Sequence, residues 1–239
     1  MERVIPKITA PSVIPEWLLT KEQKEKVGTA LEDSPINLDT NILAILVSVS
    51  GSGTVAVSGA LSGNVIVNAL TADIVDSEVT SGGSVSLGVS TDSGIIALTI
   101  GVGASGTVAV TASGFGNVIT NTVSSAITGG SLVTTGADAT LSATDDSSIV
   151  SLGLSIAASG TVSVGVIIGA NVITNSVITQ IAGSTVDSGG SVFLDALSEA
   201  NILGYAGGVA ASGVVGVQLT LAANVITNTT EASINNRTF

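Results

Sequence analysis

The sequence contains no cysteine and no histidine. Without cysteine the chain has no disulfide framework and no thiolate-ligated metal site, and without histidine it has no imidazole for acid–base catalysis. Aromatic residues make up only 2% of the 239 residues, although hydrophobic residues make up 45%. Any core therefore has to be built from small and β-branched side chains, and we expect a protein that is not an enzyme and needs no cofactor.

Positive charge is almost absent from the chain. It has six lysine and arginine residues, and none of them lies between residues 27 and 236. Of the 18 acidic residues four precede residue 27, which leaves 14 in that stretch. Nucleic-acid binding relies on lysine and arginine contacts with phosphate, so we expect no nucleic-acid partner. The contrast predicts an N-terminal anchor, residues 1–41, and a weakly acidic body, residues 42–239.

One long uncharged stretch, residues 147–186, raises the question of a membrane segment. Serine, threonine, asparagine and glycine recur throughout it, and no lysine or arginine flanks it. Membrane helices are predominantly apolar and are usually flanked by such residues, so we expect no membrane insertion. Residues 1–26 contain no apolar run of signal-peptide length.

Internal repetition is the dominant signal in the body. Ser-Gly pairs recur at spacings of 53, 54 and 53 residues, and the element Asn-Val-Ile-Thr-Asn, or Asn-Val-Ile-Val-Asn in the first unit, recurs in the same register. The asparagines of this element are Asn64, Asn68, Asn117, Asn121, Asn171, Asn175, Asn224 and Asn228. The body therefore consists of three full units and part of a fourth.

Within each unit the hydrophobic pattern has a period of two, as in Thr107–Thr111, and glycine-rich clusters interrupt it. Such runs predict short strands joined by turns. We predict an all-β fold, a repetitive β-solenoid resembling a parallel β-helix, with each 53-residue unit forming two coils of about 26 residues. About seven coils would give a rod roughly 35 Å long. Antiparallel hairpins at the Ser-Gly pairs are the alternative.

The N-terminal anchor, residues 1–41, which we call the head, has a different sequence pattern. Three prolines before Trp17 predict an extended chain, and the capping sequence Thr20–Gln23 predicts a short helix over about residues 21–31. A strand over Ile36–Thr40 then leads into the first unit.

The units resemble a known group of proteins. The run Ala104–Val110, the run Asn117–Val123 and the later turn Gly189–Ser191 resemble repeats of giant bacterial filamentous adhesins, the leukotoxin-like and haemagglutinin-like β-helical exoproteins. The resemblance covers about residues 42–234 and implies an elongated scaffold without chemistry. With its separate head, the whole chain resembles a subunit of a virion fibre or an appendage.

We interpret the repeated asparagines as structural ladders at turns, with stacked side-chain amides. An acidic residue also recurs at one repeat position. With two coils per unit these carboxylates would lie about 10 Å apart, and whether they bind cations is left open. The recurring acidic residues are Asp39, Asp92, Asp146 and Glu199. The adjacent pair Asp145-Asp146 offers no opposed carboxylates of the kind that glycosidases use, and we predict no catalytic, cofactor or metal site.

These observations predict a structural protein with a core of valine, isoleucine and leucine and a surface of serine, threonine and asparagine. The first interpretation is the rigid rod of a bacteriophage tail fibre or spike, and the second is a self-assembling appendage or surface filament whose subunits join head to tail. A receptor- or glycan-binding adhesin module is the third. The expected partners are other copies of the chain, as a trimer or a filament, and virion or appendage proteins bound through the head. The expected location is a virion or an extracellular appendage. The residues assigned to anchoring and assembly are Arg3, Lys7, Trp17, Ile234 and Phe239.

Overall fold

The computed structural model describes residues 36–235. The predictions for residues 1–35, including the extended segment, the short helix and the anchoring residues Arg3, Lys7 and Trp17, lie outside the described residues, as does Phe239. The first strand starts at Ile36, within the segment that the sequence assigned to the head. Within residues 36–235 no helix has the length and apolarity needed to cross a membrane.

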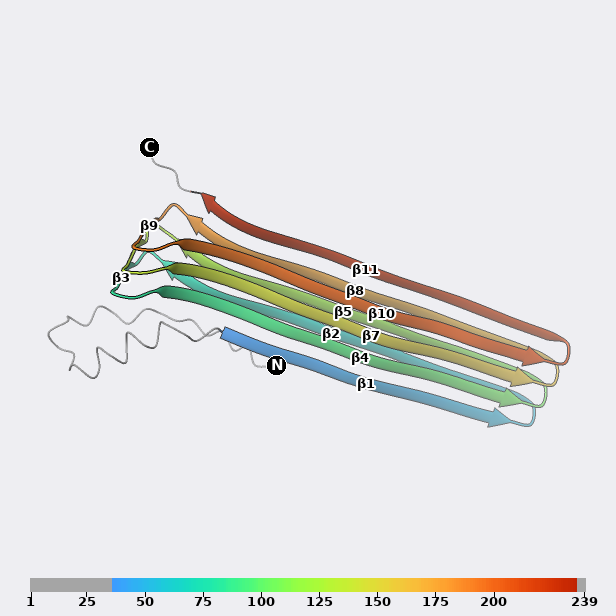
Figure 1. Ribbon diagram of the computed structural model, residues 1–239. Helices are drawn as coiled ribbons and strands as arrows, with labels where there is room; N and C mark the ends of the chain where they lie inside the picture. Colours follow the sequence, from blue (N-terminus) through green and yellow to red (C-terminus); the bar gives the residue numbers. More distant parts are fainter. Residues whose placement is uncertain (1–35, 236–239) are drawn as a thin grey trace, which may run out of the picture.

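The described residues form eleven β-strands in three parallel sheets (Figure 1). Sheet A consists of β1 (Ile36–Ser52), β4 (Val85–Ser105), β7 (Ala139–Ser159) and β10 (Val192–Ser212). Sheet B consists of β2 (Val55–Val75), β5 (Val108–Thr128), β8 (Val162–Ala182) and β11 (Val215–Asn235). The short sheet C consists of β3 (Glu78–Ser81), β6 (Leu132–Thr135) and β9 (Thr185–Ser188).

The protein is an all-β solenoid in which each repeat unit forms one coil. Strands pair with their equivalents in the next unit, so that Ile42, Ile95 and Ile149 lie side by side at neighbouring positions of sheet A. The prediction of two coils per unit is therefore wrong, and so is the count of seven coils. The alternation of side chains continues through a whole 21-residue strand, so the chain reverses only at the Ser-Gly arch and at the two corners around sheet C. The corner before sheet C has a residue of positive φ, which is Asp76 in the first unit, Gly129 in the second and Gly183 in the third.

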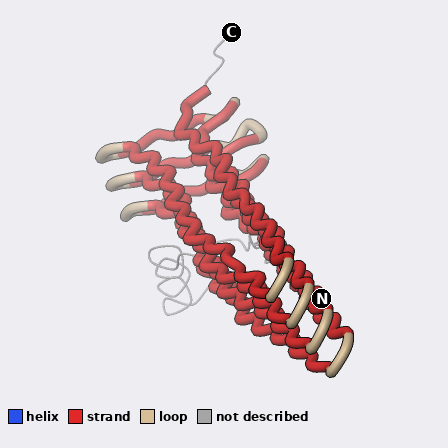
Figure 2. The backbone as a smooth tube through the Cα atoms, turned by 90° about the vertical axis from the view of Figure 1, so that its right-hand side faces the viewer, coloured by secondary structure: helices blue, strands red, loops and turns tan. Residues whose placement is uncertain are grey.

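The Ser-Gly pairs form arches between sheets rather than hairpins within one sheet. The strand before each pair belongs to sheet A and the strand after it to sheet B, and both sheets are parallel. Figure 2 shows the two long sheets face to face, joined at one end by these arches and at the other by the short strands. The hairpin alternative is therefore wrong.

The coils make a wide, flat body instead of a rod. A strand of 21 residues spans about 70 Å, whereas four strands spaced about 4.8 Å apart occupy only about 19 Å along the coil axis.

The two sheets are also offset along this axis. The strand β2 packs between β1 and β4, and β8 packs between β7 and β10, whereas β11 has only β10 as its main neighbour in sheet A. As a result β1 and β11 form the two extremes of the stack (Figure 1).

The apolar core lies between mid-strand and sheet C. Its three clusters are built from stacked residues such as Ile119, Val123 and Ile127, all inaccessible to solvent. Toward the arches the interior changes to small and polar residues, including Thr99, Gly101 and Thr111. The solenoid is therefore filled by aliphatic side chains in one half and mainly by serine, threonine, glycine and alanine in the other, with Phe115 and Ile167 as large buried exceptions.

Stacking explains the glycine at the second, third and fourth arches. A Cβ atom on Gly160 would meet the carbonyl oxygen of Gly106, and one on Gly213 would meet that of Gly160. Because the obstructing atom is backbone, no side-chain rearrangement can relieve the contact.

We expect Gly160→Ala to lower the free energy of unfolding by about 1–3 kcal/mol, because the coils have to move apart at the arch. Urea denaturation measures this. Gly116→Ala is the matched control, since a Cβ atom there has no neighbour within 4 Å, and its effect should stay within about 0.5 kcal/mol. Equal effects of the two substitutions would contradict the stacking explanation.

Candidate functional site

The first asparagine ladder runs through all four coils on the inner side of sheet B. Asn64 Nδ2 donates to Asn117 Oδ1 at 2.8 Å, and Asn117 Nδ2 donates to Asn171 Oδ1 at 2.8 Å. Asn171 Nδ2 donates to Asn224 Oδ1 at 2.7 Å. Asn117 and Asn171 are buried, and all four residues lie within strands instead of at turns. The ladder therefore has a direction, with every amide donating toward the C-terminal coil.

The second set of asparagines lies four residues further along the same strands and surrounds a buried carboxylate. Asn121 Nδ2 donates to Asp145 Oδ1 at 2.6 Å, and Asn175 Nδ2 donates to Asp145 Oδ2. Ser147 Oγ lies 3.1 Å from both carboxylate oxygens. The neighbouring coils repeat the contact without the acid, since Asn68 Nδ2 donates to Ser93 Oγ and Asn228 Nδ2 to Ser198 Oγ. A polar seam thus crosses the core from sheet B to sheet A.

Asp145 is fully buried, and burial raises the pKa of its carboxyl group above the ordinary value. Hydrogen bonds from Asn121, Ser147, Ser198 and Asn175 oppose part of that rise, because they stabilise the ionised form. The sequence contains no lysine, arginine or histidine between residues 27 and 236, so the carboxylate depends on amide and hydroxyl donors for its stabilisation.

The sequence drew attention to Asp145 only as the neighbour of Asp146. The two carboxylates lie on opposite faces of β7, because Asp145 is buried and Asp146 is exposed. The partners Ser93 and Ser147 carried no signal of their own among so many serines. The period-two pattern could have identified Asp145 as buried, since it has the same parity along the strand as Ile149.

The recurring acidic residues form an exposed row on the outer face of sheet A. Asp92 pairs directly with Asp39 on one side and with Asp146 on the other, and Asp146 pairs with Glu199. Neighbours are one strand apart, about 4.8 Å, and not about 10 Å as two coils per unit would require. At this spacing the repulsion in water is about 0.9 kcal/mol for each neighbouring pair. No group of three or more acidic residues within residues 36–235 has the geometry to hold a metal ion.

The outer surface differs from the expected coat of serine, threonine and asparagine. In the half of each coil next to the arches, most outward-facing positions are aliphatic, and Ile45, Val57 and Leu61 are 63%, 67% and 78% exposed. Most inward-facing positions there are small or polar. Sequence alone assigned the apolar residues of this half to the interior, because one alternating pattern fits either choice of face.

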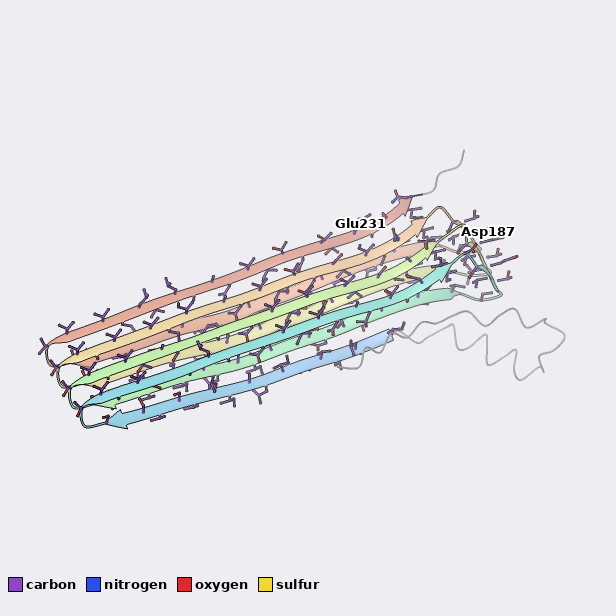
Figure 3. All side chains as sticks on the ribbon, turned by 180° about the vertical axis from the view of Figure 1, so that it is seen from behind. Asp187 and Glu231 are labelled. Atoms are coloured by element: carbon purple, nitrogen blue, oxygen red, sulfur yellow. The ribbon has the colours of Figure 1, made fainter. Side chains whose placement is uncertain are left out.

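The charged residues are also distributed unequally between the half of each coil next to the arches and the half next to sheet C. Four segments, residues 41–65, 94–118, 148–172 and 201–225, contain no charged residue. Every acidic residue within residues 36–235 therefore lies in the half that includes sheet C, as Asp187 and Glu231 illustrate (Figure 3). The body is amphipathic along its strands, with an apolar outer surface near the arches and an acidic one near sheet C.

The two ends of the stack expose core positions. Ile226 on β11 is 47% exposed, although its equivalents Ile119 and Ile173 are fully buried. Ile234, assigned to assembly by the sequence, is 60% exposed while its equivalent Ile181 is 3% exposed. Among the described residues no strand pairs with the outer edge of β11 or of β1.

Comparison with protein-family models, curated proteins and solved structures finds no match to this chain.

We expect Asn121→Ala to lower the free energy of unfolding by about 2–3 kcal/mol, because it removes a donor from a buried carboxylate. Thr122→Ala is the control, since Thr122 is the next residue and faces outward. Chemical denaturation of both variants checks this, and a loss no larger for Asn121→Ala than for Thr122→Ala would contradict the role given to the polar seam.

The raised pKa of Asp145 predicts how stability changes with pH. Between its ordinary pKa and the raised one, the folded state binds more protons than the unfolded state, so the free energy of unfolding rises as pH falls through this window. Asp145→Asn should remove this contribution. Because the pKa of Asp73 is also raised by burial, the quantity to measure is the difference between the parent protein and the variant in thermal unfolding across the acidic range. A difference that does not vary with pH would contradict the prediction.

Proposed function

We propose that the chain is a structural subunit that assembles end to end, so that stacked copies form a continuous β-solenoid filament. The observation that carries this proposal is the complementarity of the two ends of the stack. This remains a structural protein, as expected from the sequence. Of the structural interpretations, we favour a filament of stacked copies over a rod made by a single chain.

The proportions of the body support this choice. One chain extends about 70 Å along its strands but only about 19 Å along the coil axis. Stacking copies of this chain along the coil axis would make that short dimension the long one.

The offset between the sheets makes the two ends fit each other. At one end β11 extends past sheet A and leaves its inward side exposed. At the other end β1 extends past sheet B. Placing β1 of one copy beside β10 of another would cover Ile226 and supply the missing neighbour of β11. The same contact would pair the outer edge of β10 with that of β1 and the outer edge of β11 with that of β2, which protects these edges.

The ladder gives this contact a direction. Within residues 36–235, Asn224 Nδ2 donates no hydrogen bond and Asn64 Oδ1 accepts none, while every step between them is filled. In a stack of copies Asn224 would donate to Asn64 of the next copy and continue the series. Reversed stacking would bring two donors or two acceptors together, so the filament is polar.

The test is a charge placed on the exposed inward side of β11. We expect Ile226→Lys to prevent filament growth, because a lysine there would be buried without a partner in the stacked interface. The folded subunit should tolerate it, since Ile226 is already 47% exposed. Val225→Lys is a closely matched control, because Val225 is also 47% exposed but aligns with the outward-facing Val172.

Negative-stain electron microscopy and light scattering of the full chain provide the measurement, with circular dichroism to verify folding. The expected result is filaments for the parent protein and for Val225→Lys, and single folded subunits for Ile226→Lys. The proposal is wrong if the parent protein forms no filaments, or if both variants form them with unchanged spacing.

A further inference from the structure

The arch half of sheet A carries a continuous apolar surface on its outer side. We define this apolar face as the outward positions from Leu43 to Val49 of β1 and their equivalents on β4, β7 and β10. Fifteen of the sixteen positions are leucine, isoleucine, valine or tyrosine, and the exception is Gly207. No charged residue lies in this part of the sheet.

The face remains exposed in the middle of the sheet as well as at its edges. On the central strands β4 and β7, Ile96 is 55% exposed and Leu152 is 40% exposed. The corresponding region of sheet B is interrupted, because its strand β5 carries Ala112, Gly114 and Gly116 there. Sheet A therefore offers the more continuous of the two apolar surfaces.

The size of the face matches that of an interface. Four outward positions at about 6.7 Å and four strands at about 4.8 Å give about 500 Å². Two such faces together would bury about 1,000 Å², the lower limit for a specific contact between proteins. An apolar patch of about 500 Å² is as large as the largest patch on an ordinary monomer, and such patches are often functional.

We propose that this apolar face packs against the same face of a second copy, with the strands of the two copies antiparallel. The face is flat and made of aliphatic side chains from a regular sheet, which suits sheet-on-sheet packing at a distance of about 10 Å. For an unstacked subunit a lipid occupant fits less well, because the outer edges of β1 and β10 carry backbone groups that no described strand satisfies, and hydrocarbon cannot satisfy them.

Repulsion between acidic side chains favours the antiparallel arrangement. The row of Asp39, Asp92, Asp146 and Glu199 lies on the same side of sheet A, just beyond the apolar face. Parallel strands would bring the rows of the two copies together, and the described residues include no cation to separate them. A two-fold axis that lies in the interface and runs across the strands places the rows at opposite ends. The same axis leaves the direction of the coil stack unchanged, so the contact is compatible with end-to-end growth but independent of it.

The absence of cysteine makes this contact testable by cross-linking. Leu152→Cys introduces a single thiol near the centre of the apolar face, and a short bis-maleimide should link two copies of the full chain. Val164→Cys is the control on the outer face of sheet B, and Thr144→Cys is the control on the acidic half of the same strand β7. In an end-to-end filament the equivalent residues of successive copies would lie about 19 Å apart at all three sites. End-to-end contacts therefore cannot explain a difference in cross-linking yield between the sites.

We expect covalent dimers for Leu152→Cys at least tenfold more abundant than for either control. Efficient linkage of Thr144→Cys would show parallel strands and overturn the arrangement. Linkage of Val164→Cys without Leu152→Cys would place the contact on sheet B and overturn the choice of face.

A flotation assay with phosphatidylcholine vesicles tests the competing occupant. We expect the parent protein to stay in the dense fraction. Flotation of the parent protein that is lost in Leu152→Lys but retained in Thr144→Lys would show that lipid covers the face, and the proposal would then be wrong.

Discussion

The whole structure depends on parallel, in-register pairing between equivalent residues of successive repeat units. Each residue of an inner strand has a copy of its own position about 4.8 Å above and below it, so a residue type is favourable there only if it can stack on itself or on a close substitute. Asparagine meets this condition through amide-to-amide hydrogen bonds, and isoleucine meets it through contact between aliphatic side chains. Glycine meets it at the arches, where the carbonyl of one coil occupies the space of a Cβ atom in the next.

The repeat, the parallel solenoid class and the strand at Ile36 could be predicted from the sequence, because stacking leaves its period in the residues. The length of the coil could not. A strand of 21 residues is far longer than the usual strand of five or six, and the asparagines in its middle resemble turn residues when read locally. Only the pairing of Asn117 with Asn171 and of Ile95 with Ile149 shows that each unit turns once.

The sequence also could not predict which face of each strand points inward. Alternation fixes two sets of residues but does not say which set is buried, and near the arches the set with the larger side chains is the outer one. Little room remains between the sheets there, because a Cβ atom on Gly101 of sheet A would meet Thr111 and Ser113 of sheet B. Phe115 occupies the space that Gly153 and Gly169 leave open, and this relation between residues on three strands is visible only in the folded chain. The buried position of Asp145 depends on the same assignment.

One coil per unit also has a consequence for how such a protein can change in size. Because each 53-residue unit adds one layer and begins and ends at the same points of the cross-section, gain or loss of a whole unit changes the thickness of the body by about 4.8 Å. The first and last strands, and with them the two end surfaces, would keep their form. A gene containing such repeats can therefore lengthen or shorten by recombination between units while its product still fits copies of the original length.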